Sequence, residues 1–207
     1  MSTAVKFESP RRVSEEDQAR ADYYALLAAL FYRAPDDRLL QAIVVAEEPV
    51  ADAAQDLTNA WQKLAAASSV VSHDALAEEY DAAFIGVGRP PVMLYGSFYM
   101  AGFMNEKPLA ELRTDLAALG FVRNAATHET EDHIAAVCDV MRALILGDIN
   151  DAPADTETQR RFYQKHVNPW VSKCCTELTL SIATNYYKQV AGFASAFFDV
   201  ESQAFEI

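Results

Sequence analysis

Apolar side chains recur at intervals of three and four residues along most of this chain, and this spacing limits the possible fold more than any other feature. The clearest case is the set Tyr23, Leu26, Leu27, Leu30 and Phe31, which helical geometry places on one face. No segment alternates apolar and polar residues as a half-buried strand does. We therefore expect an all-α fold, a helical bundle of about eight to ten helices.

The chain is long enough for one substantial domain. Its 207 residues are 51% hydrophobic, which supplies an ample core. Residues 1–12 lack periodicity and are expected to form a loose, disordered tail, so we expect a single helical domain over residues 13–207. The longest apolar run, Tyr23 to Tyr32, is about half the length of a membrane span. Stable membrane insertion is therefore not expected.

Capping residues and helix breakers mark where several helices begin and end. Ser14 and either Ser72 or His73 are candidate N-caps, because their side chains can accept a hydrogen bond from a first-turn N–H. Either Thr127 or Thr130 is the expected cap of a long helix that Gly147 closes. We expect one or two further helices over residues 171–198.

The charge balance restricts the partners of the protein. Its 17 Lys and Arg stand against 30 Asp and Glu, a net charge of -13. Nucleic acids and anionic membrane surfaces are disfavoured, because phosphate contacts need basic residues. A basic partner is favoured, although acidity can also serve solubility alone.

The cysteines indicate the compartment. Cys138, Cys174 and Cys175 include an adjacent pair that is too close for ordinary disulfide geometry, and they form no C-x-x-C knuckle. We interpret them as reduced core thiols of a cytoplasmic protein. The segment Ser9 to Val13, S-P-R-R-V, is followed by acidic residues and not by the apolar segment of an export signal.

The stretch from Glu78 to Tyr99, EEYDAAFIGVGRPPVMLYGSFY, concentrates the helix breakers of the chain. Of the 7 Gly and 8 Pro, three Gly and two Pro fall between Gly86 and Gly96. Among them stand Val92, Met93, Leu94 and Tyr95, which we expect to be exposed. An apolar loop of restricted geometry is a candidate binding surface.

Two motifs in this chain resemble those of the TorD/DmsD/NarJ-type chaperones, which mature redox enzymes. The first family motif is E-(Y/F)-x-x-(L/F)-F-x-G-P-G followed by P-P-Y-x-S-x-Y, and it is matched here by Glu79, Tyr80, Phe84, Gly86, Gly88, Tyr95, Ser97 and Tyr99. The second, E-x-x-D-H-I, is matched by residues 129–134. This chain departs from the family pattern at Val87 and at Met93-Leu94.

The resemblance implies a groove in which Asp132 and His133 stand beside the 86–96 loop. Such a groove would have apolar walls and a carboxylate rim. It suits a signal peptide with paired arginines and an apolar segment, because guanidinium groups bind carboxylates bidentately. The residues that the resemblance assigns to this peptide site are Glu79, Phe84, Leu94, Tyr95, Ser97, Tyr99, Glu129, Asp132 and His133.

The function implied is that of a cytoplasmic chaperone and not of an enzyme. It would bind the twin-arginine signal peptide and the apo form of a molybdenum-dependent oxidoreductase and aid cofactor insertion before export. The client would be a formate dehydrogenase, a sulfoxide or amine-oxide reductase, or a nitrate reductase. A NarJ-like role, in assembling a cytoplasm-facing reductase subunit, is the second candidate. The protein is expected to be a monomer or a helix-swapped dimer and to carry no cofactor.

A metal-dependent hydrolase is the alternative from another class. The densest group of possible ligands is the run from His128 to His133. It lacks the i, i+4 pair of ligands on one helical face that H-E-x-x-H zinc sites use. The same residues could also serve a helix start, where acidic side chains interact favourably with the helix dipole.

Overall fold

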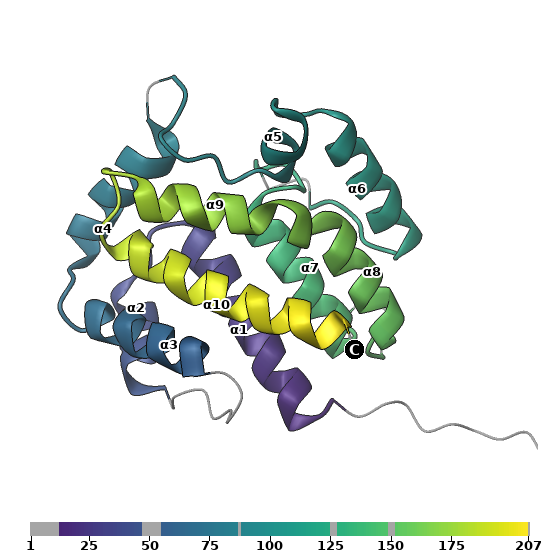
Figure 1. Ribbon diagram of the computed structural model, residues 1–207, viewed down its shortest axis with the longest axis horizontal. Coiled ribbons are helices and arrows are strands. Elements are labelled where there is room, and N and C mark those ends of the chain that lie inside the picture. The colour runs from purple at the N-terminus through teal and green to yellow at the C-terminus, as the bar shows by residue number, and fades with distance from the viewer. Residues whose placement is uncertain (1–12, 47–54, 87, 125–127, 149–151, 207) are drawn as a thin grey trace, which may run out of the picture.

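The computed structural model describes residues 13–46, 55–86, 88–124, 128–148 and 152–206, and α-helices build the fold throughout these ranges (Figure 1). Within them lie ten α-helices and one π-helical turn, η1. In chain order they are α1 (Glu15–Tyr32), α2 (Asp37–Val45), α3 (Gln55–Ser68), α4 (His73–Tyr80), η1 (Asp81–Ile85), α5 (Gly96–Ala101), α6 (Lys107–Ala118), α7 (Ile134–Leu146), α8 (Thr156–His166), α9 (Asn168–Leu180) and α10 (Tyr186–Glu206). The described ranges contain no strand, only an isolated bridge between Tyr95 and His133. The predicted all-α bundle is confirmed.

The helices pack in two layers around one apolar core. Figure 1 shows α9 and α10 crossing in front of α1 and α7, with α2 and α3 at one end and α5 and α6 at the other. One cluster of buried residues runs from α1 to α10.

The expected tail, residues 1–12, lies outside the described ranges, and the single domain over 13–207 stays a prediction. No helix in the described ranges combines the length and apolarity that a bilayer span requires.

The predicted apolar stripe of α1 faces this core. Leu27, Leu30 and Phe31 are fully buried, whereas Tyr23 and Leu26 are partly buried against the same cluster. The ring of Tyr23 meets that of Phe193 on α10 edge to face, with 5.5 Å between ring centroids. The helical spacing in the sequence therefore indicated the correct buried face.

The helix starts test the capping predictions. Ser14 accepts a hydrogen bond from the N–H of Asp17 at 3.0 Å, and Ser72 accepts from that of Ala75 at 3.3 Å. Both predicted caps are confirmed. The expected Thr127 or Thr130 cap of the long helix is wrong, because His133 caps α7 and residue 127 lies outside the described ranges. The 171–198 region contains two helices, α9 and α10, separated at residues 181–185.

A buried ion pair joins the first helix to the last. Arg20 on α1 binds both carboxylate oxygens of Glu201 on α10, with Nε to Oε1 at 2.6 Å and Nη2 to Oε2 at 2.9 Å. The Glu201 side chain is 1% exposed, and Tyr24 also donates to it at 2.9 Å. A buried carboxylate needs such partners, because an unpaired charge in the core is strongly destabilising. The pair therefore fixes the register of α1 against α10.

Glu79 joins α4 to the start of α10. Its carboxylate accepts hydrogen bonds from the backbone N–H groups of Asn185, Tyr186 and Tyr187 at 2.7, 3.0 and 2.8 Å. The first N–H groups of a helix have no partner within the helix, and the negative charge also suits the positive end of the helix dipole. Glu79 thus caps a helix more than 100 residues away in sequence.

We expect Glu79→Ala to lower the free energy of unfolding by about 1–3 kcal/mol, because three N–H groups lose a charged acceptor. Urea denaturation measures this change. Glu78→Ala is the matched control, because Glu78 is exposed on the same helix and should change stability by less than about 0.5 kcal/mol. Equal stability of the two variants would contradict the capping role of Glu79.

Candidate functional site

The two sequence motifs meet through their backbones. The N–H of Gly96 donates to the carbonyl of Asp132 at 2.9 Å, and the N–H of Ile134 donates to the carbonyl of Leu94 at 2.8 Å. These bonds form the antiparallel bridge between Tyr95 and His133. Asp132 and His133 therefore stand directly beside the end of the 86–96 loop, as expected.

Asp132 is used inside the protein. It is 4% exposed, and its Oδ2 accepts a hydrogen bond from the N–H of Ser97 at 2.8 Å. Its Oδ1 accepts one from the hydroxyl of Thr130 at 2.6 Å. The sequence suggested that Asp132 lies in the first turn of the long helix, α7. Asp132 instead precedes α7 and binds the first turn of α5. The Ser97 hydroxyl, also buried, accepts a hydrogen bond from the N–H of Asn105 at 3.2 Å.

His133 begins α7. Its Nδ1 accepts a hydrogen bond from the N–H of Ala135 at 3.2 Å, and its ring meets that of Tyr95 edge to face at 5.1 Å. Burial lowers the pKa of His133 to about 4, against the opposing influence of Glu129 and Asp132. The imidazole is therefore neutral at pH 7, which its role as a hydrogen-bond acceptor requires.

Acidic and phenolic groups gather near this junction. The hydroxyl of Tyr95 donates to Oε2 of Glu129. Burial, followed by this hydrogen bond, raises the pKa of Tyr95. The pKa of Tyr80 rises to about 12, first through burial and then through the charges of Glu129 and Asp81. In the described part of the chain, neither Glu129 nor Asp81 forms an ion pair. The arrangement leaves net negative charge beside two protonated phenols.

An aromatic platform supports the opposite side of the segment. Tyr99 stacks on Trp170 of α9 at 5.8 Å between ring centroids, and its hydroxyl lies 2.8 Å from both the Met93 carbonyl and Oε2 of Glu177. A Cβ on Gly96 would come within 2.9 Å of the Trp170 indole nitrogen. Glycine at position 96 therefore lets α9 approach the start of α5.

The expectation that the loop presents exposed apolar side chains is wrong for Val92, Met93 and Leu94, whereas Tyr95 is half-buried. Val92, Met93 and Leu94 are 1%, 8% and 3% exposed, because the loop returns to the core and the N–H of Val92 bonds to the carbonyl of Ala83 at 3.2 Å. Phe84 is also buried, against the rings of Tyr80 and Tyr187. In this conformation Phe84 and Leu94 support the loop from beneath, and their predicted contact with a peptide is untested.

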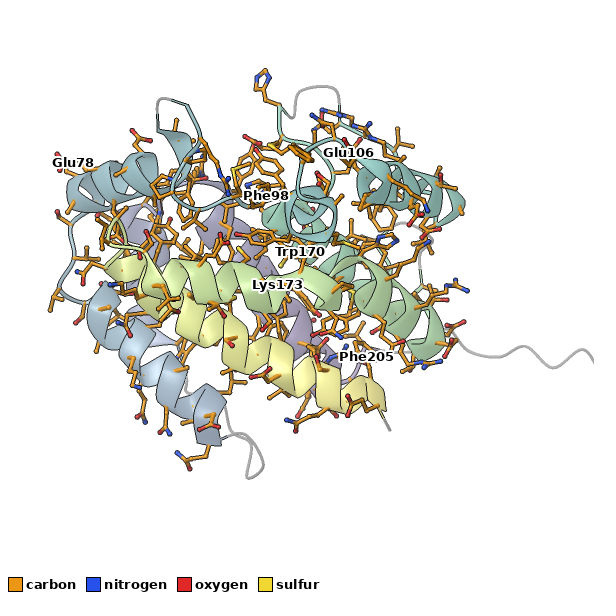
Figure 2. The ribbon with its side chains drawn as sticks, turned by 45° about the horizontal axis from the view of Figure 1, so that its top comes forward. Glu78, Phe98, Glu106, Trp170, Lys173 and Phe205 are labelled. Atoms are coloured by element: carbon orange, nitrogen blue, oxygen red, sulfur yellow. The ribbon has the colours of Figure 1, made fainter. Side chains whose placement is uncertain are left out.

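The exposed apolar residues at this end of the molecule are different ones. Met100 is 41% and Phe103 72% exposed, on and just after α5. Phe98, half-buried on the same helix, lies beneath the guanidinium of Arg89, 4.7 Å from its ring centroid. Figure 2 shows Phe98 between Glu78 and Glu106 along this edge of the protein. Sequence reasoning missed these residues, because nothing in the local pattern separates an exposed from a buried aromatic residue.

Another carboxylate of the ligand-rich run is also engaged. Glu131 binds Arg113 at 2.9 Å and Arg123 at 3.3 Å, and although burial raises its pKa, the hydrogen bond from Arg113 brings it below the usual value. No group of three or more His, Cys, Asp or Glu side chains in the described ranges is arranged to hold a metal ion. The geometry of His133 and Asp132, whose acceptor atoms bond to the protein, therefore gives the metal-hydrolase alternative no support.

We expect Asp132→Ala to destabilise the fold by about 2 kcal/mol, because the N–H of Ser97 and the hydroxyl of Thr130 lose a buried acceptor. Asp132→Asn should cost less, because its amide oxygen can still accept from Ser97. Asp139→Ala, on the exposed face of α7, is the control and should cost less than about 0.5 kcal/mol. A normal urea midpoint for Asp132→Ala would show that α5 does not need this cap.

The lowered pKa of His133 predicts a pH dependence. An unfolded His takes up a proton below about pH 6.5, whereas folded His133 does so only near pH 4, so its contribution to stability is lost as the pH falls between these values. His133→Asn keeps a side-chain acceptor but does not titrate. Between pH 7 and pH 5 the unfolding free energy of this variant should fall less than that of the wild type. The difference between the two decreases should be on the order of 1–2 kcal/mol. Identical pH profiles from urea unfolding would refute this assignment.

Comparison with known proteins shows the fold and the family of this chain. A solved structure described as that of "a putative redox enzyme maturation protein" from Archaeoglobus fulgidus has the same fold, with 19% sequence identity and a TM-score of 0.56 over 88% of this chain and 93% of that one. No curated protein sequence matches the chain. The family model of the nitrate reductase delta subunit matches residues 50–176, a span that includes both motifs. The chain belongs to this nitrate reductase delta subunit family, whose members include the TorD/DmsD/NarJ-type chaperones.

Proposed function

We propose that this protein is a cytoplasmic chaperone for the assembly of a molybdenum-dependent oxidoreductase, and that it binds the twin-arginine signal peptide of the apo enzyme. Its family membership supports the chaperone role. The site binds and releases an unfolded segment and catalyses no reaction. Occupying the signal until the cofactor has been inserted would delay export of an incomplete enzyme.

The observation that carries the arginine assignment is the unpaired negative charge of Glu129 and Asp81. These carboxylates lie near the hydroxyl groups of Tyr80 and Tyr95. Glu129 accepts from Tyr95 through Oε2, which leaves its Oε1 and the Asp81 carboxylate as the acceptors for a guanidinium. Asp132 is a weaker candidate for direct contact, because both of its oxygens already bind protein donors. In the proposal, Glu79, Asp132, His133 and Ser97 hold the site in shape, and Glu129 contacts the peptide.

The apolar part of the peptide would bind the exposed surface of α5. Met100, Phe103 and the half-buried Phe98 are on or just after the helix that begins next to Tyr95. Burying such side chains supplies the larger, salt-independent part of the binding free energy, about 25 cal/mol for each Å² of apolar surface removed from water. Leu94 and Phe84 act through the position of the loop.

A NarJ-like role is the second candidate. The match to the nitrate reductase delta subunit model favours it. In this role the protein would bind an apolar segment of a cytoplasm-facing reductase subunit, and paired arginines would not be needed. The two functions thus differ in the requirement for arginine.

The test uses two synthetic peptides that share one apolar segment and carry either Arg-Arg or Gln-Gln. Isothermal titration calorimetry should show about tenfold tighter binding of the Arg-Arg peptide, because its guanidinium groups pair with Glu129 and Asp81. Glu129→Gln should remove most of this difference while retaining an acceptor for Tyr95. Added salt should weaken the Arg-Arg peptide more than the Gln-Gln peptide.

Glu157→Gln on α8 is the control, because Glu157 is exposed and paired with Arg160. It should leave both affinities unchanged. Equal binding of the two peptides by the wild type would exclude arginine recognition and favour the NarJ-like role. No binding of either peptide would contradict both.

A further inference from the structure

A groove runs along the outer face of α10, away from the peptide site. It consists of three hollows of about 730, 580 and 390 Å³ between α10 and the flanking helices α3, α4 and α9. The first and second hollows share Lys63 and Gln189, and the first and third share Asp56 and Asp199. The three are therefore continuous along α10, whose 21 residues span about 30 Å.

Gly192 lies in the middle of this groove and has no explanation within the monomer. Glycine inside a helix is unfavourable relative to alanine, because it loses more backbone freedom on folding. A Cβ built on Gly192 meets no atom within 4 Å, so the fold itself leaves room for a side chain. The open space above Gly192 would let the backbone of a partner molecule approach α10 closely.

The charges of the groove are arranged with opposite signs at its two ends. Lys63 on α3 lies beside the start of α10, which carries Lys188, and Asp56 lies beside the later turn with Asp199. None of the four forms an ion pair within the described residues. Gly192 lies between the basic and the acidic end.

We propose that this groove is the interface of a symmetric homodimer, in which α10 of one copy packs antiparallel to α10 of the other. A two-fold axis near Gly192 would place Lys188 and Lys63 of each copy opposite Asp199 and Asp56 of its partner. Interfaces of this kind require one patch to be complementary to itself. The face formed by α10 and its flanking helices is about 30 Å long and two to three helices wide, at ~10 Å for each helix. Its area is therefore close to the ~800 Å² that each partner buries in a stable interface.

A second copy fits better than an unrelated helix. An unrelated partner would need only charges complementary to the groove, in any order, whereas two-fold symmetry demands opposite signs at equal places on either side of its centre. Lys188 lies four residues before Gly192 and Asp199 seven residues after it, so the centre of this charge pattern falls between Phe193 and Ala194, within one helical turn of Gly192. The net charge of -13 opposes association over long distances, so the dimer is expected at physiological ionic strength, where the Debye length is about 8 Å.

Charge reversal on α10 tests the proposal. Light scattering after size-exclusion chromatography, and analytical ultracentrifugation up to roughly 100 μM protein, should show a dimer for the wild type. Lys188→Asp and Asp199→Lys should each weaken the dimer at least tenfold, because each places like charges opposite one another at both ends. The two changes in the same chain should restore it, because the axis brings each position next to the other.

Gly192→Leu tests the close approach independently. The variant should remain folded, with at least the wild-type melting temperature, and should be monomeric. Lys107→Asp on α6, where Lys107 is 85% exposed, is the control and should leave the dimer intact. A monomeric wild type at all concentrations would overturn the proposal, as would a dimer that none of the α10 variants weakens. The latter result would instead indicate a helix-swapped dimer.

Discussion

The described structure depends on carboxylates that accept hydrogen bonds from the N–H groups at the start of distant helices. Glu79 does this for α10 and Asp132 for α5. These N–H groups have no partner inside their own helix, and removing the carboxylate is expected to cost about 1–3 kcal/mol at each of the two helix starts. The two carboxylates stand on either side of the breaker-rich segment in sequence, one before it and one after it. They therefore fix both ends of a stretch that has little regular structure of its own.

This framework explains why the family motif is largely buried. Asp132 accepts from the N–H of Ser97 and so joins α5 to the start of α7, whereas His133 caps α7 itself. The Ser97 hydroxyl accepts from the N–H of Asn105 after α5, and Glu79 uses its carboxylate on α10. Changing such residues would alter stability and the shape of the site together, so a binding defect in them alone would not identify a contact residue. Glu129 separates the two effects, because Glu129→Gln removes its charge and retains an acceptor for the Tyr95 hydroxyl.

The sequence predicted the helices well because each helix carries its own apolar stripe and, in α1 and α4, its own capping serine. It also predicted that the two motifs lie together, through the family resemblance. It failed where the answer depends on distant partners: the exposure of Leu94, the use of Asp132 on α5, and the pairing of Glu131 with Arg113. No local pattern reports such contacts, because the partner can lie anywhere in the chain.

The two surfaces for which we propose partners differ in charge, and salt should affect them in opposite directions. At the peptide site Glu129 and Asp81 form no ion pair within the described residues, whereas Glu131 pairs with both Arg113 and Arg123. Screening weakens the proposed attraction between the two unpaired carboxylates and a cation. The α10 groove balances two lysines against two aspartates. There the main long-range effect between copies is the repulsion of two chains of charge -13, which screening reduces. Moderate salt should therefore favour self-association while it weakens peptide binding, so the two surfaces can be separated without any mutation.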